Sequence, residues 1–148
     1  MATSFTQALR KQFVRIGEDP ANFAAEFDRW KVSFPSGEFS HPLFGKDGAY
    51  TNRLGAEVDM LRHVHLIPLQ DPAALAKWEV NHLRRSRKTS DRVLVYASDE
   101  RHGHLLIYIL EEPTAHAVAQ MKTPQHRELM LKLAKIASRF VEDGVVIG

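Results

Sequence analysis

Cysteine is absent from this sequence of 148 residues. Its absence excludes disulfide scaffolds and zinc sites built from thiolates, and it fits a reducing cytoplasm, where we expect the protein to reside. Long apolar runs are lacking too: no stretch approaches about eighteen residues, and residues 1–13 have no apolar core of a signal peptide. No membrane association is therefore expected.

Neither sign of charge is in large excess. The formal net charge is +2, which by itself says little about partners, although the basic residues are clustered. Hydrophobic residues make up 44% of the chain and charged residues 26%, values typical of a folded globular protein. We expect a single domain over residues 1–148, large enough for a hydrophobic core.

Two sites combine a capping carboxylate with a proline, and a third combines threonine with proline. Asp19–Pro20 and Asp71–Pro72 predict helices over residues 20–33 and 72–83. Thr123–Pro124 begins a last helix, whose apolar residues line one side. These signals are local and independent of one another.

The N-terminal segment is ambiguous. Apolar residues recur every four positions from Phe5 to Phe13, which favours a helix capped by Thr3 or Ser4. A strand over residues 13–16 is the alternative.

Two apolar runs rich in β-formers, Val93–Ala97 and Leu105–Leu110, flank a polar loop containing Gly103. They predict an antiparallel hairpin, and because neither run alternates, both of its faces should be covered inside a sheet. Residues 61–67 predict another strand, while residues 35–55, rich in Gly and Pro, are expected to form a long docked loop. The fold class is therefore α+β, a small antiparallel β-sheet packed against helices.

A dense basic stretch leads into this hairpin. Guanidinium groups bind phosphate through two parallel hydrogen bonds, lysine adds a mobile charge, and hydroxyl groups can complete the cradle. The stretch predicts a site for a polyanion, with a solvated basic loop as the alternative, and its acidic member either joins the site or partners the cations. The candidates are Arg84, Arg85, Arg87, Lys88, Thr89 and Asp91.

Histidines supply the candidates for acid–base chemistry. His63 and His65 lie two apart in the strand predicted over residues 61–67, so they share one face of the sheet. Such a pair can ligate a metal, act on a scissile phosphate, or simply fix a sheet surface, and no further metal-ligand motif accompanies it. His116 follows Pro113–Thr114, which opens a short helical turn after the hairpin. It is placed either to meet a substrate anion or to pack.

Four segments of the chain, taken in their order along the sequence, resemble the YafO family of bacterial type II toxins. The resemblance covers roughly residues 23–140, so residues 1–19 form a variable N-terminal segment. The segments are Phe44-Gly45-Lys46-Asp47 with Tyr50, His63-Val64-His65-Leu66, Arg87 to Tyr96, and Leu105 to His116.

The resemblance implies a RelE/ParE-like fold, in which the opening segment is a strand. It also implies an endoribonuclease that cuts mRNA in association with the ribosome and is held inactive by a cognate antitoxin. In this family, cleavage proceeds without metal or other cofactor, by attack of the ribose 2′-hydroxyl on the adjacent phosphate. His63, His65 and His116 would then supply the base and the acid. Arg87 and Lys88 would stabilise the phosphorane, and Lys46 matches the family motif and is expected to contact RNA.

Two rival functions remain open: a non-catalytic toxin of the same fold, and a nucleic-acid-binding module whose affinity is driven by phosphate contacts. Loss of toxicity when the three histidines are replaced would favour the endoribonuclease over both rivals. We expect the antitoxin to lay an acidic or amphipathic segment across Arg84–Arg92.

Overall fold

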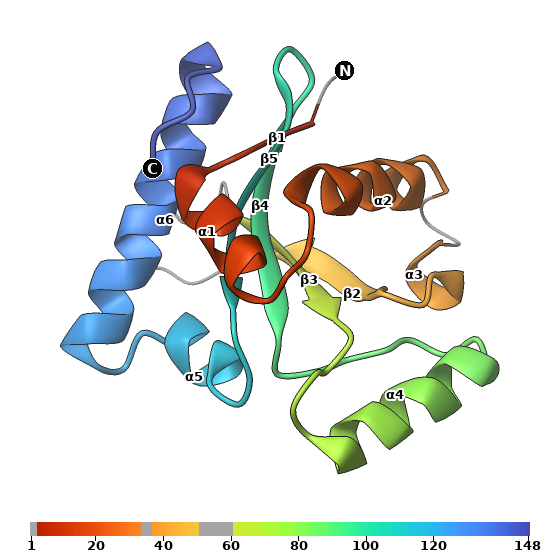
Figure 1. Ribbon diagram of the computed structural model, residues 1–148. Coiled ribbons are helices and arrows are strands. Elements are labelled where there is room, and N and C mark those ends of the chain that lie inside the picture. Colours follow the sequence, from red (N-terminus) through yellow and green to blue (C-terminus); the bar gives the residue numbers. More distant parts are fainter. Residues whose placement is uncertain (1–2, 34–36, 51–60) are drawn as a thin grey trace.

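The computed structural model describes residues 3–33, 37–50 and 61–148, without the side chains of residues 37 and 38. Its strands form one sheet in the order β1-β5-β4-β3-β2 (Figure 1). All neighbouring pairs are antiparallel except β1 and β5, which run parallel. The α+β class is confirmed, with one parallel edge added to the antiparallel sheet that the sequence predicts. The strands are β1 Thr3–Phe5, β2 Phe44–Ala49, β3 Arg62–Leu66, β4 Val93–Asp99 and β5 Gly103–Leu110.

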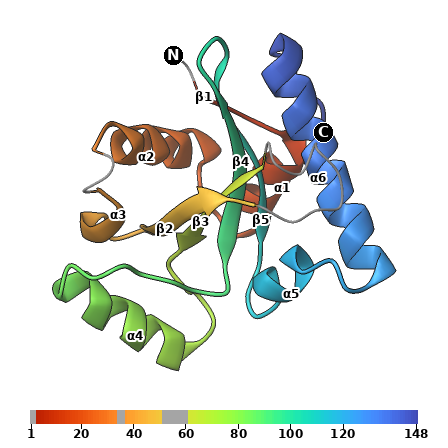
Figure 2. The same cartoon turned by 180° about the vertical axis from the view of Figure 1, so that it is seen from behind.

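Helices cover both faces of this sheet. On one face, α1 and α2 bury Leu9, Phe27 and Trp30 against the strands. On the other face, α5 and α6 pack over β4 and β5 through residues such as Leu133 and Phe140. Figure 2 shows β2 and β3 on the near side with α5 and α6 beside them, and none of the described helices crosses the near face of these two strands. Their far face is covered by α2, whose Trp30 stacks on Phe44. The helices are α1 Gln7–Arg15, α2 Pro20–Val32, α3 Gly37–Ser40, α4 Pro72–Leu83, α5 Ala115–Ala119 and α6 Pro124–Asp143.

The capping signals act as the sequence predicts. Asp19 accepts a hydrogen bond from Ala21 N, and Asp71 accepts from Ala73 N at the start of α4. Thr123 caps α6 by accepting from His126 N. The hairpin prediction is confirmed as well, with β4 and β5 both inside the sheet.

The N-terminal segment contains both a strand and a helix. The helix prediction is confirmed for α1, but its cap is Thr6, whose Oγ1 lies 3.1 Å from Leu9 N. Thr3 and Ser4 cannot cap it because they belong to β1, which pairs with β5. The alternative of a strand over residues 13–16 is wrong, since Phe13 is buried inside α1.

The long loop expected over residues 35–55 is wrong where the structure describes it. The described part of this range contains α3 and the edge strand β2, while residues 35, 36 and 51–55 lie outside the described residues. The sequence does not predict β2 because the strand contains two glycines and two charged residues, which have low strand propensity. Pairing with β3 overrides that low propensity. In the part of the chain that is described, no helix is both long enough and apolar enough to cross a membrane.

Candidate active site

His63 and His65 project from β3 on the face of the sheet against which α6 packs. In the register of the sheet, His63 is paired with Val95 and His65 with Val93, and both valines belong to the core beneath α6. The two imidazole rings are 5.8 Å apart between centroids. The period of two along a strand therefore places them together as the sequence predicts.

His116, at the start of α5, joins this pair. The three histidines line one hollow of about 50 Å³, far smaller than the roughly 300–1,000 Å³ of a pocket for a drug-sized ligand. A hollow of this size has room for a small group only. Its lining is completed by Tyr50, Ser90, Val93, Ala115 and Ala119.

The main chain of Ser90 holds the ring of His65. The Nδ1 atom of His65 lies 2.9 Å from Ser90 N and 2.8 Å from Ser90 O. Unprotonated Nδ1 accepts from the N–H group, and protonated Nδ1 donates to the carbonyl, so the ring orientation is fixed in either state. Ser90 is itself anchored, because its Oγ donates to Leu66 O at 2.6 Å.

The next residue, Asp91, fixes the position of His116. Its Oδ1 atom accepts a hydrogen bond from His116 N at 2.6 Å, which ties the beginning of α5 to the segment before β4. Consecutive residues thus place two histidines that are 51 positions apart in the sequence, His65 and His116. From the sequence, Asp91 either joins the polyanion site or partners the neighbouring cations, whereas the structure directs its carboxylate to the backbone of α5.

Burial controls the protonation of the two histidines on β3. Burial, reinforced by the nearby His65, lowers the pKa of His63 to about 4. Burial also lowers the pKa of His65, while the hydrogen bond with Ser90 opposes that shift. Both rings are therefore neutral at pH 7, and a neutral imidazole can accept a proton. His63 stacks on Tyr50 with ring centroids 4.1 Å apart.

Lys46, on β2, is a cation near His63 and His65, although it does not line the hollow. Its side chain is exposed, and its ammonium is close enough to lower the pKa of both His63 and His65. Gly48, the partner of His63 across β2 and β3, has no side chain to cover the imidazole. The edge strand β2, which the sequence analysis did not predict, thus places one cation near the two histidines and leaves His63 uncovered at Gly48.

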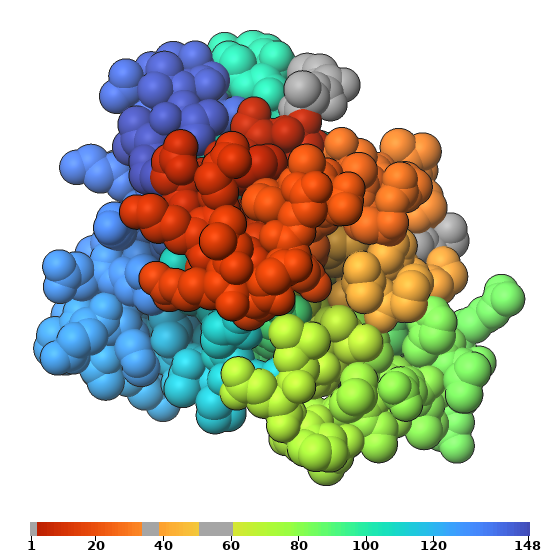
Figure 3. Space-filling view, viewed as in Figure 1, coloured from red at the N-terminus to blue at the C-terminus, as the bar shows by residue number. Residues whose placement is uncertain are grey.

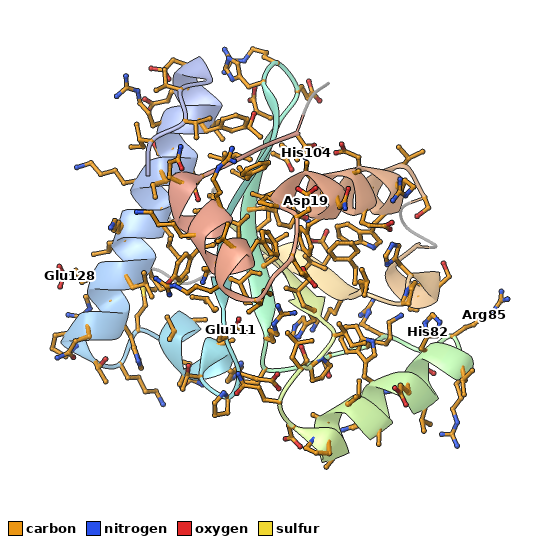
Figure 4. The ribbon with its side chains drawn as sticks, viewed as in Figure 1. Asp19, His82, Arg85, His104, Glu111 and Glu128 are labelled. Atoms are coloured by element: carbon orange, nitrogen blue, oxygen red, sulfur yellow. The ribbon has the colours of Figure 1, made fainter. Side chains whose placement is uncertain are left out.

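The predicted basic stretch is divided by the fold. Arg84 and Arg85 are exposed at the end of α4, and Figure 4 shows Arg85 projecting from that end, away from α5. Arg87 is exposed with its guanidinium 5.8 Å from the ring centroid of Phe39, and Thr89 is exposed on the same segment. None of these four lines the hollow.

The prediction that Lys88 contacts RNA and stabilises the phosphorane is wrong. Its side chain is fully buried, with Nζ 3.2 Å from Phe39 O and 3.5 Å from His82 Nδ1. The ammonium also lies over the ring of Trp78, at 5.7 Å from the centroid. An ammonium in this position cannot reach an RNA phosphate or a phosphorane, so its role is to join α3, α4 and the segment before β4.

Asp47, which the family motif contains, lies on the opposite face of the sheet from the hollow. Its buried carboxylate accepts hydrogen bonds from Tyr96 Oη and, at 3.0 Å, from Arg62 Nη2, and Lys31 Nζ lies 3.4 Å away. These contacts hold β2 against β3 and β4. Asp47 therefore holds its segment in place.

Tyr50 and Ser90 are lining residues that sequence analysis did not assign to the site. Both stand inside segments quoted for the family resemblance, but neither residue type at those positions signals a place in a hollow. Among the described residues, no group of three or more His, Cys, Asp or Glu side chains is arranged to hold a metal ion.

Comparison with models of protein families identifies the family of this chain. The family model described as Toxin YafO, type II toxin-antitoxin system, matches residues 28–142. The chain belongs to the YafO toxin family. The YafO match spans every residue that lines the hollow and leaves β1 and α1 outside it.

Membership in the YafO family, which the sequence resemblance predicted, implies a cognate antitoxin as partner. Searches of curated proteins and of solved structures each returned no match.

Proposed function

We propose that this YafO family toxin is an endoribonuclease that cuts mRNA in association with the ribosome and so inhibits translation. The observation that carries the proposal is the convergence of His63, His65 and His116 on one small hollow, with Lys46 near the first two. Ribosome association is inferred from the family resemblance.

In the proposed reaction, one neutral imidazole removes the proton from the ribose 2′-hydroxyl, and the 2′-oxygen attacks the adjacent phosphorus. A second, protonated imidazole donates its proton to the departing 5′-oxygen. The products are a 2′,3′-cyclic phosphate and a 5′-hydroxyl end, and no water is consumed. The chemistry asks for two imidazoles in opposite protonation states and a cation beside the phosphorane.

The surroundings of each residue suggest its part. His63 and His65 are neutral at pH 7, so we assign the base to this pair on β3. His116, whose side chain is exposed on α5, is assigned the acid, and Lys46 the stabilisation of charge on the phosphorane. We assign Arg87, which sequence reasoning gave to the phosphorane, to the RNA backbone outside the hollow.

The test uses a defined mRNA, with and without translating ribosomes, and maps the cut ends and their terminal phosphates. Wild-type protein should leave cyclic phosphates, and His63→Ala, His65→Ala and His116→Ala should each reduce the cleavage rate. At least two of the three should lose about 10²–10⁴-fold, the usual contribution of an acid–base group.

A matched control is His126→Ala, which replaces a histidine of α6 outside the hollow and should cleave at the wild-type rate. An mRNA with a 2′-deoxyribose at the cut nucleotide should resist cleavage, because the nucleophile is missing. Full toxicity of all three hollow variants would overturn the proposal and favour a non-catalytic toxin.

A further inference from the structure

The helix α4 is attached to the body by one face. Trp78 is its buried residue, 2% exposed, and the indole Nε1 donates to Pro42 O at 3.0 Å. Figure 3 shows α4 along the lower right edge of the molecule, where it forms part of the outer surface. The side of α4 opposite Trp78 is therefore turned to solvent.

That opposite side carries an apolar stripe. Ala73, Ala76, Val80 and Leu83 stand two and five positions on either side of Trp78, which places them across the helix from it at 100° per residue. All four are exposed, Val80 by 44% and Leu83 by 83%. Their successive spacings of three, four and three residues are those of the a and d positions of a coiled coil, the pattern that a partner helix fits.

Cations stand at the end of the stripe. Arg84 and Arg85 directly follow Leu83 and are exposed. Arginine beside a solvent-exposed leucine suits an acidic, amphipathic helix, because carboxylates pair with guanidinium groups while leucine meets apolar side chains. An RNA backbone would use the arginines and leave the apolar stripe uncovered.

We propose that the α4 surface, formed by this stripe together with Arg84 and Arg85, is the docking site of an acidic amphipathic helix of the cognate antitoxin. The proposal rests on membership in the toxin family and not on the proposed RNA cleavage. It replaces the wider surface expected over Arg84–Arg92, because Lys88 and Arg92 are buried.

The α4 surface is joined through the chain to one wall of the hollow. The chain continues from Arg85 to Ser90, whose main chain holds His65 at the hollow. A helix bound along the outer side of α4 would contact the start of this segment at Arg84 and Arg85, and it would leave the hollow itself open. The proposed docking therefore rests on the stripe and the two arginines, not on closeness to the hollow.

The test measures the affinity of the full chain for its cognate antitoxin by calorimetry. A Leu83→Glu/Arg84→Glu variant should bind at least about tenfold more weakly, as expected when an apolar anchor and its neighbouring charge are both reversed. Leu131→Glu/Lys132→Glu makes the same change at an exposed Leu-Lys pair of α6 and should bind within about twofold of wild type.

Hydrogen exchange on the wild-type protein gives an answer independent of any variant. Antitoxin binding should slow the exchange of backbone amides in residues 73–87, and unchanged exchange there would overturn the proposal. Equal affinities of the two charge-reversed variants would overturn it too.

Two other occupants give different results. Light scattering that shows a dimer of the toxin alone, abolished by Leu83→Glu/Arg84→Glu, would assign the surface to a second copy. Loss of RNA cleavage by this variant with undiminished antitoxin affinity would assign it to RNA. Failure of the wild type to cut RNA would overturn the proposed function only. The docking proposal would still be decided by the measured antitoxin affinities.

Discussion

Gly45 and Gly48 lie three residues apart on β2, and adding the same methyl group to each should have opposite effects. At Gly45 a Cβ atom would stand 2.3 Å from Lys88 O and 2.9 Å from the Cη2 atom of Trp78. At Gly48 the nearest atom would be the Cε1 of His63, at an ordinary contact distance of 3.9 Å. A methyl group would therefore clash with neighbouring atoms at Gly45 and fit without a clash at Gly48.

Neither atom facing Gly45 can retreat easily. Lys88 O accepts a hydrogen bond from Lys46 N at 2.8 Å, and Trp78 is the buried anchor of α4. Relief of the clash means giving up that bond, worth about 1 kcal/mol, and repacking the indole, at about 1–3 kcal/mol for an overpacked site. Gly45→Ala should therefore destabilise the protein by about 3 kcal/mol.

The melting temperature reports this difference directly. For a chain of this size, about 3 kcal/mol corresponds to a decrease of roughly 6–12 °C for Gly45→Ala. Gly48→Ala should be neutral or raise the melting temperature slightly, because alanine restricts the unfolded chain and stabilises by up to about 1 kcal/mol.

Differential scanning calorimetry of wild type and both variants is the assay. Circular dichroism at 20 °C should first show that all three are folded. Equal melting temperatures for the two alanine variants would refute the reasoning, since they share residue type, strand and method and differ only in the atoms that a methyl group meets.

Three further predictions follow from the site and its supports. Asp91→Ala should slow RNA cleavage at saturating substrate by about tenfold or more, since α5 loses the bond at His116 N, while Asp91→Asn keeps an acceptor and should restore most of the rate; equal losses in both would show that the charge matters instead. Glu112→Ala should lower the free energy of unfolding in urea by about 2 kcal/mol, because the buried carboxylate accepts from two backbone N–H groups, and an unchanged urea midpoint would contradict this. Since the pKa of His63 falls from an unfolded value of about 6.5 to about 4, its contribution to stability is complete above pH ~6.5 and lost as the pH falls toward 4. His63→Leu should therefore flatten the fall in unfolding free energy over that range, and parallel curves for variant and wild type would be the contrary outcome.

Local signals in the sequence determined much of this protein. The caps at Asp19, Asp71 and Thr123 begin helices without help from distant residues, because a capping side chain bonds to N–H groups two or three positions away. The same holds for the shared face of His63 and His65, which follows from the period of a strand. Such features depend on neighbours within a few residues.

Tertiary structure alone decided which charged residues reach the site. Arg87 and Lys88 are adjacent and look alike in the sequence, yet one is exposed and the other fully buried under α3 and α4. Lys46 lies near His63 and His65 because β2 pairs with β3, a pairing that the composition of β2 does not suggest. Asp91 holds His116 across 25 residues. Contacts of this kind form only when distant segments pack, so no local pattern carries them.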